Sequence, residues 1–502
     1  MRKRSYDIVI VGSGAGGGTV AQELSPLCKN DGLGIAVLEK GPRLRDEEFS
    51  GRELEMARTL YEDGAGFLTA EGTMTLAFGR AYGGSTVVYT GTSLLPPERV
   101  IQRWDVPGIT FDDIARRARK FMAENNVHLL EDKLINENNR LFVEGCRRLG
   151  YRVQQFPVNI KGCRGSSLCN LGCPNQAKQG TDRVQLPRAE RNGVEVVTRC
   201  EVLAIEGKTL VARVSPKPPD GKGEPSPWEP GEYRIAARII VVCAGAVNTP
   251  ALLLRSGMAK RLLRLGRGFT AHPAYIVVAE HERPITNFVG HPKSFYLDQF
   301  ADSDHFVLET CMYFPFTTAK SLTGFGEAHS AFMRAFPRLQ MILVLICDQA
   351  DAHNRVTIDG RGRPVVHYRF TPEVARALVR GAITSAKICF AAGARRVHVP
   401  VAQPATVEAR DAGRLEQVAQ ECHFEPGRMA VSAAHLQGGC AMGRTPSDSV
   451  TDAYGRVHGI PWLFVADASL FPNSVEINPY LTIMALADRV AEKTKEEIRA
   501  LL

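Results

Sequence analysis

Residues 6–18 read Tyr-Asp-Ile-Val-Ile-Val-Gly-Ser-Gly-Ala-Gly-Gly-Gly, and this stretch decides the fold. Its first six residues are a mostly apolar run rich in β-branched side chains, which is typical of a strand buried on both faces. Residues 19–27 continue in a helical pattern, and residues 34–39 form a second buried strand that ends in an acid. A strand, a glycine turn, a helix and a second strand with a terminal acid are the order that a dinucleotide-binding site requires.

The spacing of the glycines explains how this turn would hold a dinucleotide. Gly12 permits the tight turn, Gly14 lets the backbone approach a pyrophosphate, and Gly17 allows the helix to pack closely on the strand. Glu39 can accept hydrogen bonds from both ribose hydroxyls, which indicates an adenosine without a 2′-phosphate. These residues predict nucleotide binding, and NAD and FAD fit them equally well.

Composition excludes several classes of protein. The chain has 502 residues, of which 44% are hydrophobic and 23% are charged, so wholesale disorder is excluded. Its 12 cysteines are far too sparse for a disulfide-stapled secreted scaffold. At roughly 150 residues per domain, the length suggests about three domains.

Charge and targeting signals indicate no special partner or compartment. The net charge of +8 is spread out, and its clusters at residues 116–120 and 261–267 fit solvated helix faces, so we expect no nucleic-acid partner. The longest apolar runs, at residues 6–11, 239–247 and 341–347, fall far short of the roughly 18 residues of a transmembrane helix. We find no signal-peptide cleavage site, so the cytoplasm is the expected compartment, with export alongside a partner subunit left open.

Four further motifs follow the dinucleotide turn. Residues 79–92 read Gly-Arg-Ala-Tyr-Gly-Gly-Ser-Thr-Val-Val-Tyr-Thr-Gly-Thr, a second glycine cluster. Residues 241–258 predict a buried strand, a turn and a helix that begins near Thr249-Pro250, with the threonine as its N-cap. The last two motifs are residues 432–443, Ser-Ala-Ala-His-Leu-Gln-Gly-Gly-Cys-Ala-Met-Gly, and residues 465–487.

Together these motifs resemble the glucose–methanol–choline (GMC) oxidoreductases, which use FAD, and are similar to the bacterial branch that contains the catalytic subunits of FAD-dependent glucose dehydrogenases. The resemblance covers about residues 5–100, 160–270 and 350–495. It implies an α/β fold in which a Rossmann-like FAD-binding domain is interleaved with a substrate domain built on an antiparallel sheet.

The resemblance also implies how the chain divides, and it reduces the expected number of domains to two. The FAD-binding domain is expected to comprise residues 1–100, 180–285 and 431–502. The substrate domain is expected to comprise residues 101–179 and 286–430, including the Cys-rich segment 163–173.

The same resemblance assigns residues to the cofactor. Val202 would hold the adenine through its backbone, and Asp467 and Asn478 would contact the cofactor from the C-terminal part of the chain. Val88 stands where members with covalently attached flavin have a histidine, so the FAD should be dissociable. The second glycine cluster would supply the remaining contacts, which are Arg80, Gly83, Gly84 and Ser85.

The C-terminal motifs carry the residues expected to do the chemistry. Alcohol oxidation removes a proton from the hydroxyl and a hydride from carbon, so a base must lie near the hydroxyl, and histidine suits that role at neutral pH. By the resemblance, His435 is this base, and the hydride passes to flavin N5. Asn478 aligns with the family's second histidine or asparagine and would bind the substrate oxygen, although a residue before Pro479 is also a good helix N-cap.

We therefore predict an FAD-dependent dehydrogenase or oxidase that acts on primary or secondary alcohols. Residues 285–430 are rich in aromatic side chains, which more often build a core than a pocket but here favour an apolar or bulky alcohol over a free sugar. Two alternatives stay open: a flavin-holding electron-transfer subunit, which the His435/Asn478 pair disfavours, and a non-oxidising family member such as a lyase or photodecarboxylase. The sequence names neither the alcohol nor the oligomeric state.

Three cysteines, Cys163, Cys169 and Cys173, lie within 11 residues, and Pro174 follows the last of them. A disulfide with one free thiol needs an oxidising compartment, and a zinc site needs a fourth ligand. The spacing resembles that of bacterial FAD-dependent glucose dehydrogenase subunits, which carry a three-iron cluster, although related proteins have a fourth cysteine where this chain has Ser166. A [3Fe-4S] cluster would pass electrons to a protein acceptor. With merely structural thiols, the acceptor would be oxygen or a quinone.

Overall fold

The dinucleotide-binding elements predicted near the N-terminus lie in the parallel part of a mixed sheet. The structure, a computed structural model, describes residues 1–402 and 405–501. Strand β1 (Arg2–Val11) pairs in parallel with β2 (Ile35–Leu38) on one side and with β11 (Gly231–Val242) on the other. Neighbours on both edges bury the last four residues of β1, as the continuous apolar run predicts.

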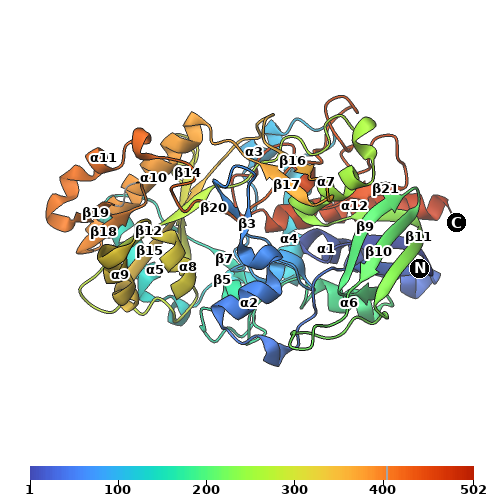
Figure 1. Cartoon of the computed structure of the whole chain (residues 1–502), viewed down its shortest axis with the longest axis horizontal. Helices are drawn as coiled ribbons and strands as arrows, with labels where there is room; N and C mark the ends of the chain where they lie inside the picture. The colour runs from blue at the N-terminus through green and yellow to red at the C-terminus, as the bar shows by residue number, and fades with distance from the viewer. Residues whose placement is uncertain (403–404, 502) are drawn as a thin grey trace.

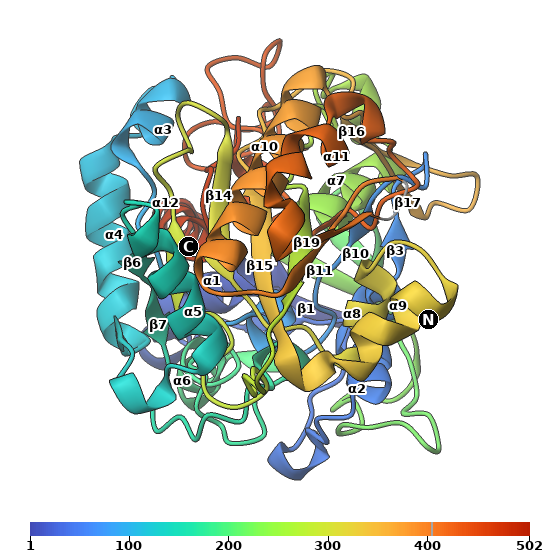
Figure 2. The same cartoon turned by 90° about the vertical axis from the view of Figure 1, so that its left-hand side faces the viewer.

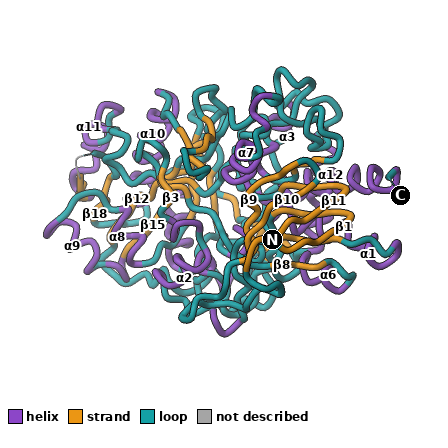
Figure 3. The backbone as a smooth tube through the Cα atoms, turned by 45° about the vertical axis from the view of Figure 1, so that its right-hand side comes forward, coloured by secondary structure: helices purple, strands orange, loops and turns teal. Residues whose placement is uncertain are grey.

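This first sheet has seven strands in the order β8-β2-β1-β11-β10-β9, with β21 paired to β11. Figure 3 shows β9, β10, β11 and β1 side by side in it. Strands β10 and β9 run antiparallel to their neighbours and extend the sheet at one edge. The bounds of its other strands are β8 (Glu195–Val197), β9 (Cys200–Glu206), β10 (Thr209–Val214) and β21 (Leu463–Val465).

Helices cover this sheet and fix the glycine turn. Helix α1 (Ala15–Asp31) starts directly after Gly14 and packs against α6 (Gln185–Arg191) and α12 (Tyr480–Ala500). It ends at Gly32, whose φ of 68° is the left-handed conformation that commonly stops a helix. The first turn of α1 therefore lies at the carboxyl end of β1, where Rossmann-like folds bind their dinucleotide.

A second sheet of ten strands is antiparallel through its centre. Its strands β12 (Ala274–Glu280) and β15 (Leu339–Ile346) are buried along their whole length. Helices α5 (Glu137–Arg148) and α10 (Pro372–Ala391) lie together over this sheet (Figure 2), while Leu343 of β15 faces a cavity described below. The predicted fold class, a Rossmann-like α/β unit combined with an antiparallel sheet, is confirmed.

The second sheet collects short strands from distant parts of the chain, in the order β3-β4-β20-β12-β15-β14-β13-β6, with β18 paired to β12 and β19 paired to β18. Strand β20 pairs with both β4 and β12, so this sheet fixes the start of the segment that contains His435.

The predicted domain boundaries stay a prediction. The bounds are β3 (Phe67–Leu68), β4 (Thr75–Leu76), β6 (Gln154–Gln155), β13 (Phe295–Leu297), β14 (Phe306–Thr310), β18 (Arg396–Val399), β19 (Ala405–Glu408) and β20 (Ser432–Ala433).

In Figure 1 the first sheet and both chain ends lie on the right, and the second sheet lies on the left. Nowhere in the described chain does a helix combine the length and the apolar character that crossing a bilayer requires. The remaining elements are α2 (Glu53–Leu60), α3 (Glu98–Arg103), α4 (Phe111–Glu124), α8 (Pro315–Ser321), α9 (Gly326–Arg334), α11 (Leu415–Val418), the pair β5 (Val127–Leu129) and β7 (Pro157–Asn159), and the pair β16 (Arg355–Ile358) and β17 (Pro364–His367).

The helix after β11 begins earlier than predicted. Helix α7 (Gly245–Arg255) starts four residues before Thr249, so the expected N-cap at Thr249 was wrong. The cap comes instead from a distant segment: an oxygen of Asp467 accepts hydrogen bonds from the Gly245 N–H at 2.8 Å and from the Thr249 hydroxyl at 2.5 Å. A carboxylate at a helix N-terminus satisfies free N–H groups and interacts favourably with the helix dipole.

Candidate active site

Residues of both sheets line one cavity of about 730 Å³. This volume is within the size range of ligand pockets. Its walls include Gly12 and Gly14 of the first glycine turn, Gly84 of the second glycine cluster, and His435 and Asn478 of the C-terminal motifs. The fold thus brings four separate sequence motifs to one space.

Two glycines of the first turn are required by close backbone packing. Gly12 has a φ of +97°, and a Cβ there would lie 2.4 Å from the carbonyl oxygen of Cys243. A Cβ at Gly17 would lie 1.9 Å from the carbonyl oxygen of Gly12. Gly17 does not line the cavity. Its missing side chain instead lets α1 lie close to the turn after β1.

Gly14 is different, because its missing side chain leaves free space. A Cβ at Gly14 would meet only the Cα of Gly84, at an ordinary contact distance of 3.8 Å. Gly14 lines the cavity and precedes the first turn of α1. Its free space is therefore available to a ligand that approaches the helix N-terminus.

Glu39 is a buried acid that lines the same end of the cavity. One carboxylate oxygen accepts hydrogen bonds from the Ser13 N–H at 3.1 Å and from the Ser13 hydroxyl at 2.7 Å, and the other accepts from the Gly41 N–H at 2.7 Å. Burial raises the pKa of Glu39. Val202 of β9 lines the cavity too, and its carbonyl accepts a hydrogen bond from Arg255 at 3.4 Å.

The second glycine cluster divides into residues that face the cavity and residues that support it. Gly84 and Ser85 line the cavity, and the Ser85 hydroxyl accepts a hydrogen bond from the Gly79 N–H at 2.9 Å. Gly83 lies behind them, where its N–H donates to the Ser13 hydroxyl at 2.9 Å and ties the two glycine turns together. Arg80 does not line the cavity either.

Val88 and Asp467 both line the cavity. Val88 is buried and offers only aliphatic carbon to the cavity. Both carboxylate oxygens of Asp467 accept hydrogen bonds from the protein. One oxygen caps α7, and the other accepts from the Ser469 N–H at 2.8 Å. Burial raises the pKa of Asp467.

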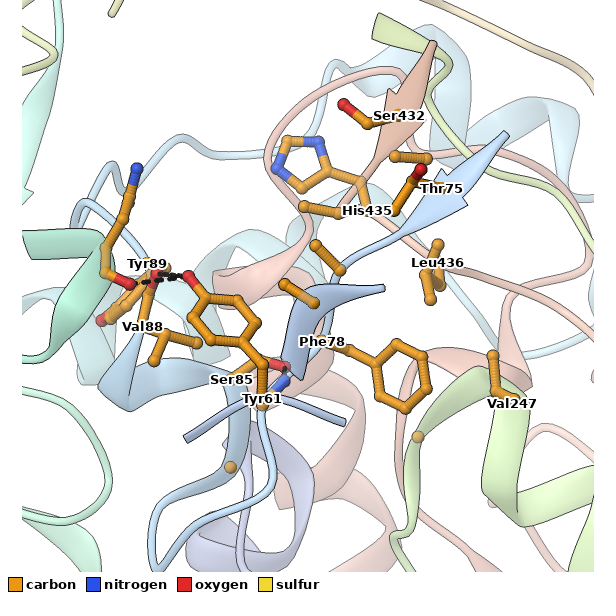
Figure 4. A pocket seen from close by; sticks show the side chains of 18 of the residues that line it. Tyr61, Thr75, Phe78, Ser85, Val88, Tyr89, Val247, Ser432, His435 and Leu436 are labelled. Atoms are coloured by element: carbon orange, nitrogen blue, oxygen red, sulfur yellow. Dashed lines mark hydrogen bonds between the residues drawn. The ribbon is translucent and has the colours of Figure 1, made fainter. Parts of the chain in front are cut away.

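His435 and Asn478 come together at the cavity, although 43 positions separate them in sequence. The Asn478 amide nitrogen lies 3.3 Å from Nε2 of His435. Figure 4 shows that the His435 ring shares this cavity with the rings of Tyr61 and Phe78. Helix α12 starts at Tyr480, and no capping bond from Asn478 is formed in the described chain, so its expected role as an N-cap was wrong.

The surroundings of His435 keep its imidazole neutral. Burial, with the nearby Lys293 ammonium, lowers the pKa of His435 to about 3. Lys293 lines the cavity and forms a buried ion pair with Glu309 of β14. An uncharged imidazole is the form that can accept a proton.

A second histidine, which sequence reasoning missed, supports His435 from behind. Nδ1 of the buried His272 lies 3.0 Å from Nδ1 of His435, and their rings meet edge to face. His272 stands 163 positions before His435 in a segment with no motif of its own. The only signal in the sequence was a histidine directly before Pro273 and β12.

The part of the cavity beside β15 is lined by both apolar and polar side chains, and the polar ones include Thr317, Lys320 and Thr323. The segment that follows β14 contributes Met312, Tyr313, Phe314 and Phe316, and β15 contributes Leu343. Tyr296, Phe306 and Phe332 of the predicted substrate region are buried in the core instead, whereas Phe325 is 93% exposed.

Comparison with known proteins agrees with this geometry. GMC oxidoreductase family models match residues 57–274 and residues 350–487, which together are well over half of the chain. The chain belongs to the GMC oxidoreductase family. The resemblance seen in the sequence motifs is therefore confirmed.

Several relatives of this GMC oxidoreductase are recognisable over almost its whole length. An uncharacterized GMC-type oxidoreductase of Mycobacterium tuberculosis is 32% identical over 98% of this chain and 76% of its own length. A long-chain-alcohol oxidase of Arabidopsis thaliana is 27% identical over 98% of this chain and 68% of its own length. Formate oxidase of Aspergillus oryzae RIB40 shares the fold, with a TM-score of 0.72 at 14% identity over 100% of both chains.

The fold of this GMC oxidoreductase is an FAD-binding one, and its residues fit the cofactor. Gly14 leaves space beside the N-terminus of α1, the position at which Rossmann-like folds hold a pyrophosphate, and the buried acid Glu39 and Val202 line the cavity as well. Arg255 lines it as well, and its Nε is buried without a partner in the described chain. These groups suit the adenosine and pyrophosphate of FAD.

The predicted metal ligands of this GMC oxidoreductase are not assembled as a metal site. Within residues 1–402 and 405–501, no three His, Cys, Asp or Glu side chains are placed to hold a metal ion. The thiols of Cys163 and Cys173 accept hydrogen bonds from backbone N–H groups at 3.4 Å and 3.3 Å. None of the three cysteines forms a disulfide in the described chain. As they stand, the three thiols do not fit a [3Fe-4S] cluster.

Lys178 ties this cysteine segment to the cavity wall. Its ammonium is buried and donates to the carbonyl oxygens of Val87, Tyr89 and Cys169 at 2.6 Å, 2.7 Å and 2.7 Å. Burial lowers the pKa of Lys178. The three carbonyls belong to two segments that are distant in sequence, so one side chain holds both.

His398 should make the stability of the protein depend on pH. Burial lowers its pKa to about 4, whereas an unfolded histidine titrates near 6.5. The unfolded chain then binds a proton that the folded chain does not, so the stability from His398 is full above pH 6.5 and is lost as the pH falls toward 4. We expect the free energy of unfolding of the wild type, relative to a His398→Gln variant, to fall by roughly 2 kcal/mol between pH 7.5 and pH 5.

Urea titration of both proteins at the two pH values measures this change. The His353→Gln variant is the matched control for replacing a histidine by glutamine, because the His353 side chain is 71% exposed. A difference between wild type and His398→Gln that stays constant, or that grows at pH 5, contradicts the expectation.

Proposed function

We propose that this protein oxidises a primary or secondary alcohol, apolar or bulky, with FAD as a non-covalent cofactor. The observation that carries the proposal is the position of a neutral histidine, His435, beside Asn478 on the same cavity as the dinucleotide turn. A binding protein has no need of an uncharged base at that place, whereas alcohol oxidation does.

The residues of the cavity divide the work. His435 accepts the hydroxyl proton at Nε2, and Asn478 binds the substrate oxygen and fixes the position of the reacting carbon. Lys293 helps to keep His435 uncharged, because two positive charges close together are unfavourable. Bound FAD would accept the hydride from carbon at its N5 position.

The substrate end of the cavity supports an apolar alcohol. Met312, Phe314 and Leu343 offer no hydrogen bonds from their side chains, and a polyol such as a free sugar would leave its hydroxyls unpaired against them. The similarity to a long-chain-alcohol oxidase points in the same direction. We therefore rank aliphatic and aromatic alcohols above sugars.

Anaerobic mixing with a panel of alcohols tests the proposal. Loss of the oxidised-flavin absorbance with an aliphatic or aromatic alcohol, and not with glucose, is the expected result. If no alcohol in the panel bleaches the flavin, the proposed reaction is wrong. If only sugars do so, the proposed substrate class is wrong.

The electron acceptor depends on whether the cysteine segment binds iron. A [3Fe-4S] cluster on Cys163, Cys169 and Cys173 would require the segment to rearrange, since the three thiols are not placed to hold a metal ion. Oxygen or a quinone is therefore the acceptor we propose, and we expect anaerobically purified protein to contain less than about one iron per chain. About three irons per chain, with the EPR signal of a three-iron cluster, would reverse this choice.

The compartment we propose is the cytoplasm. All 12 cysteines lie in the described residues, and none of them is paired. Unpaired thiols persist in reducing compartments.

A further inference from the structure

A line of hydrogen bonds leads from the backbone to the proposed base. The Val475 N–H donates to Oε1 of Gln437 at 2.8 Å, and Nε2 of Gln437 lies 3.1 Å from Nε2 of His272. Nδ1 of His272 lies 3.0 Å from Nδ1 of His435. Gln437 and His272 are both buried, and neither lines the cavity.

The direction of this line is set at its buried end. A backbone N–H can only donate, so the Gln437 atom that faces Val475 must be the amide oxygen. The amide nitrogen, which can only donate, then faces His272. Nε2 of His272 must therefore accept and carries no hydrogen.

The same reasoning fixes the hydrogen on each imidazole. Burial lowers the pKa of His272 well below its usual value, so its ring is neutral and carries one N–H, which must be on Nδ1. That N–H donates to Nδ1 of His435, whose own single N–H is then on Nε2. Ser474 permits this arrangement, because its hydroxyl, 2.9 Å from Nε2 of His272, can donate as well as accept.

Asn478 completes the line. Its amide nitrogen lies 3.3 Å from Nε2 of His435, while its amide oxygen is buried without a partner among the described residues. A half-turn of the amide brings the oxygen to the His435 N–H and satisfies both groups. Every group from Gln437 to Asn478 then has a partner of the opposite kind.

We propose that Gln437 is a positioning residue that acts through His272 to hold His435 with its hydrogen on Nε2. The resting site thus presents a hydrogen-bond donor to the cavity, and Nε2 of His435 can accept the alcohol proton only after its hydrogen has moved to Nδ1. This rests on the proposed function, because proton acceptance from an alcohol needs the Nε2 lone pair. In the reversed arrangement, the hydrogen of His435 is on Nδ1 and the hydrogen of His272 is on Nε2. The Gln437 amide N–H and the His272 N–H then face each other as two donors. Gln437 therefore restrains the reaction.

The tautomers themselves are the first test. Purified FAD-loaded protein labelled with 15N only in its histidine rings gives a long-range 1H–15N correlation spectrum, and His435→Gln and His272→Gln variants assign the two rings. We expect hydrogen on Nε2 of His435 and on Nδ1 of His272. Hydrogen on Nδ1 of His435 would overturn the proposal. This readout needs no substrate, so it stands even if no alcohol reduces the flavin.

A Gln437→Glu substitution reverses the line. One carboxylate oxygen still accepts from Val475, and the other accepts from His272, which moves its hydrogen to Nε2 and frees Nε2 of His435. In the same spectrum the hydrogens should move to Nδ1 of His435 and Nε2 of His272. With an alcohol that reduces the flavin, the anaerobic rate of reduction should rise at least roughly fivefold, since a buried unpaired donor no longer opposes the reaction.

An exposed position supplies the control for added charge. Gln102 is exposed, and Gln102→Glu should leave both the spectrum and the rate unchanged. An unchanged or slower reduction rate in a folded Gln437→Glu variant contradicts a restraining role for Gln437. If the variant does not fold, the spectrum of the wild type decides.

Discussion

His435→Gln is expected to slow anaerobic flavin reduction by an alcohol by about 10²–10⁴-fold, the usual contribution of a general base. Glutamine fills similar space and keeps a hydrogen-bonding end near Asn478, but it cannot accept a proton at neutral pH. Stopped-flow absorbance with the best alcohol of the panel measures the rate. FAD content and melting temperature should stay close to those of the wild type, because His435 contacts the cavity and not the dinucleotide turn.

The exposed His353 provides the matched variant. His353→Gln makes the same chemical change at an exposed residue that does not line the cavity, and its flavin should be reduced at the wild-type rate. A His435→Gln rate within about threefold of the wild type, in protein that retains FAD, would show that another group takes the proton.

Gly14→Ala is expected to weaken FAD binding by roughly 10–100-fold without unfolding the apoprotein. The added Cβ meets only the Cα of Gly84 at 3.8 Å, so the protein accommodates it. The same carbon occupies the space beside the N-terminus of α1, where the pyrophosphate accepts its hydrogen bonds. Each such bond to a charged group contributes about 1.5–3 kcal/mol, which converts to the stated loss.

Titration of apoprotein with FAD, followed by flavin fluorescence, measures this affinity, and thermal melts of the apoprotein measure stability. Gly360→Ala is the control, because a Cβ there meets nothing within 4 Å. Gly17→Ala is the opposite case, since its Cβ would lie 1.9 Å from a backbone oxygen and should prevent correct folding. Unchanged FAD affinity in Gly14→Ala would mean that the pyrophosphate does not bind at this turn.

The sequence predicts the first sheet well because the signals for it are local. The buried strand β1, the glycines after it and the strand β2 lie within 40 residues, and the close contact that requires Gly17 is with Gly12 of the same turn. His435 and Asn478 could be proposed from motif resemblance, and they do reach one cavity. Their chemical state was not predictable, because burial and Lys293 set it.

Features made by distant residues were not predictable from local pattern. Helix α7 begins at Gly245 because Asp467, 222 positions away, accepts its first N–H. His272 supports His435 across 163 positions, and a histidine before a proline gives no hint of that. In both cases the decisive partner is brought close by the fold, and no short spacing records it.

The buried ammonium of Lys178 has a consequence for recombination between relatives. Because Lys178 donates hydrogen bonds to the carbonyl oxygens of both Tyr89 and Cys169, the cysteine segment and the cavity wall cannot be exchanged independently of each other. A chimera that takes one of these two segments from a relative without a matching lysine leaves three buried carbonyl oxygens without a hydrogen-bond donor. Viable crossovers in this chain should therefore avoid separating residues 87–89 from residues 169–178, or should carry the lysine along with the imported piece.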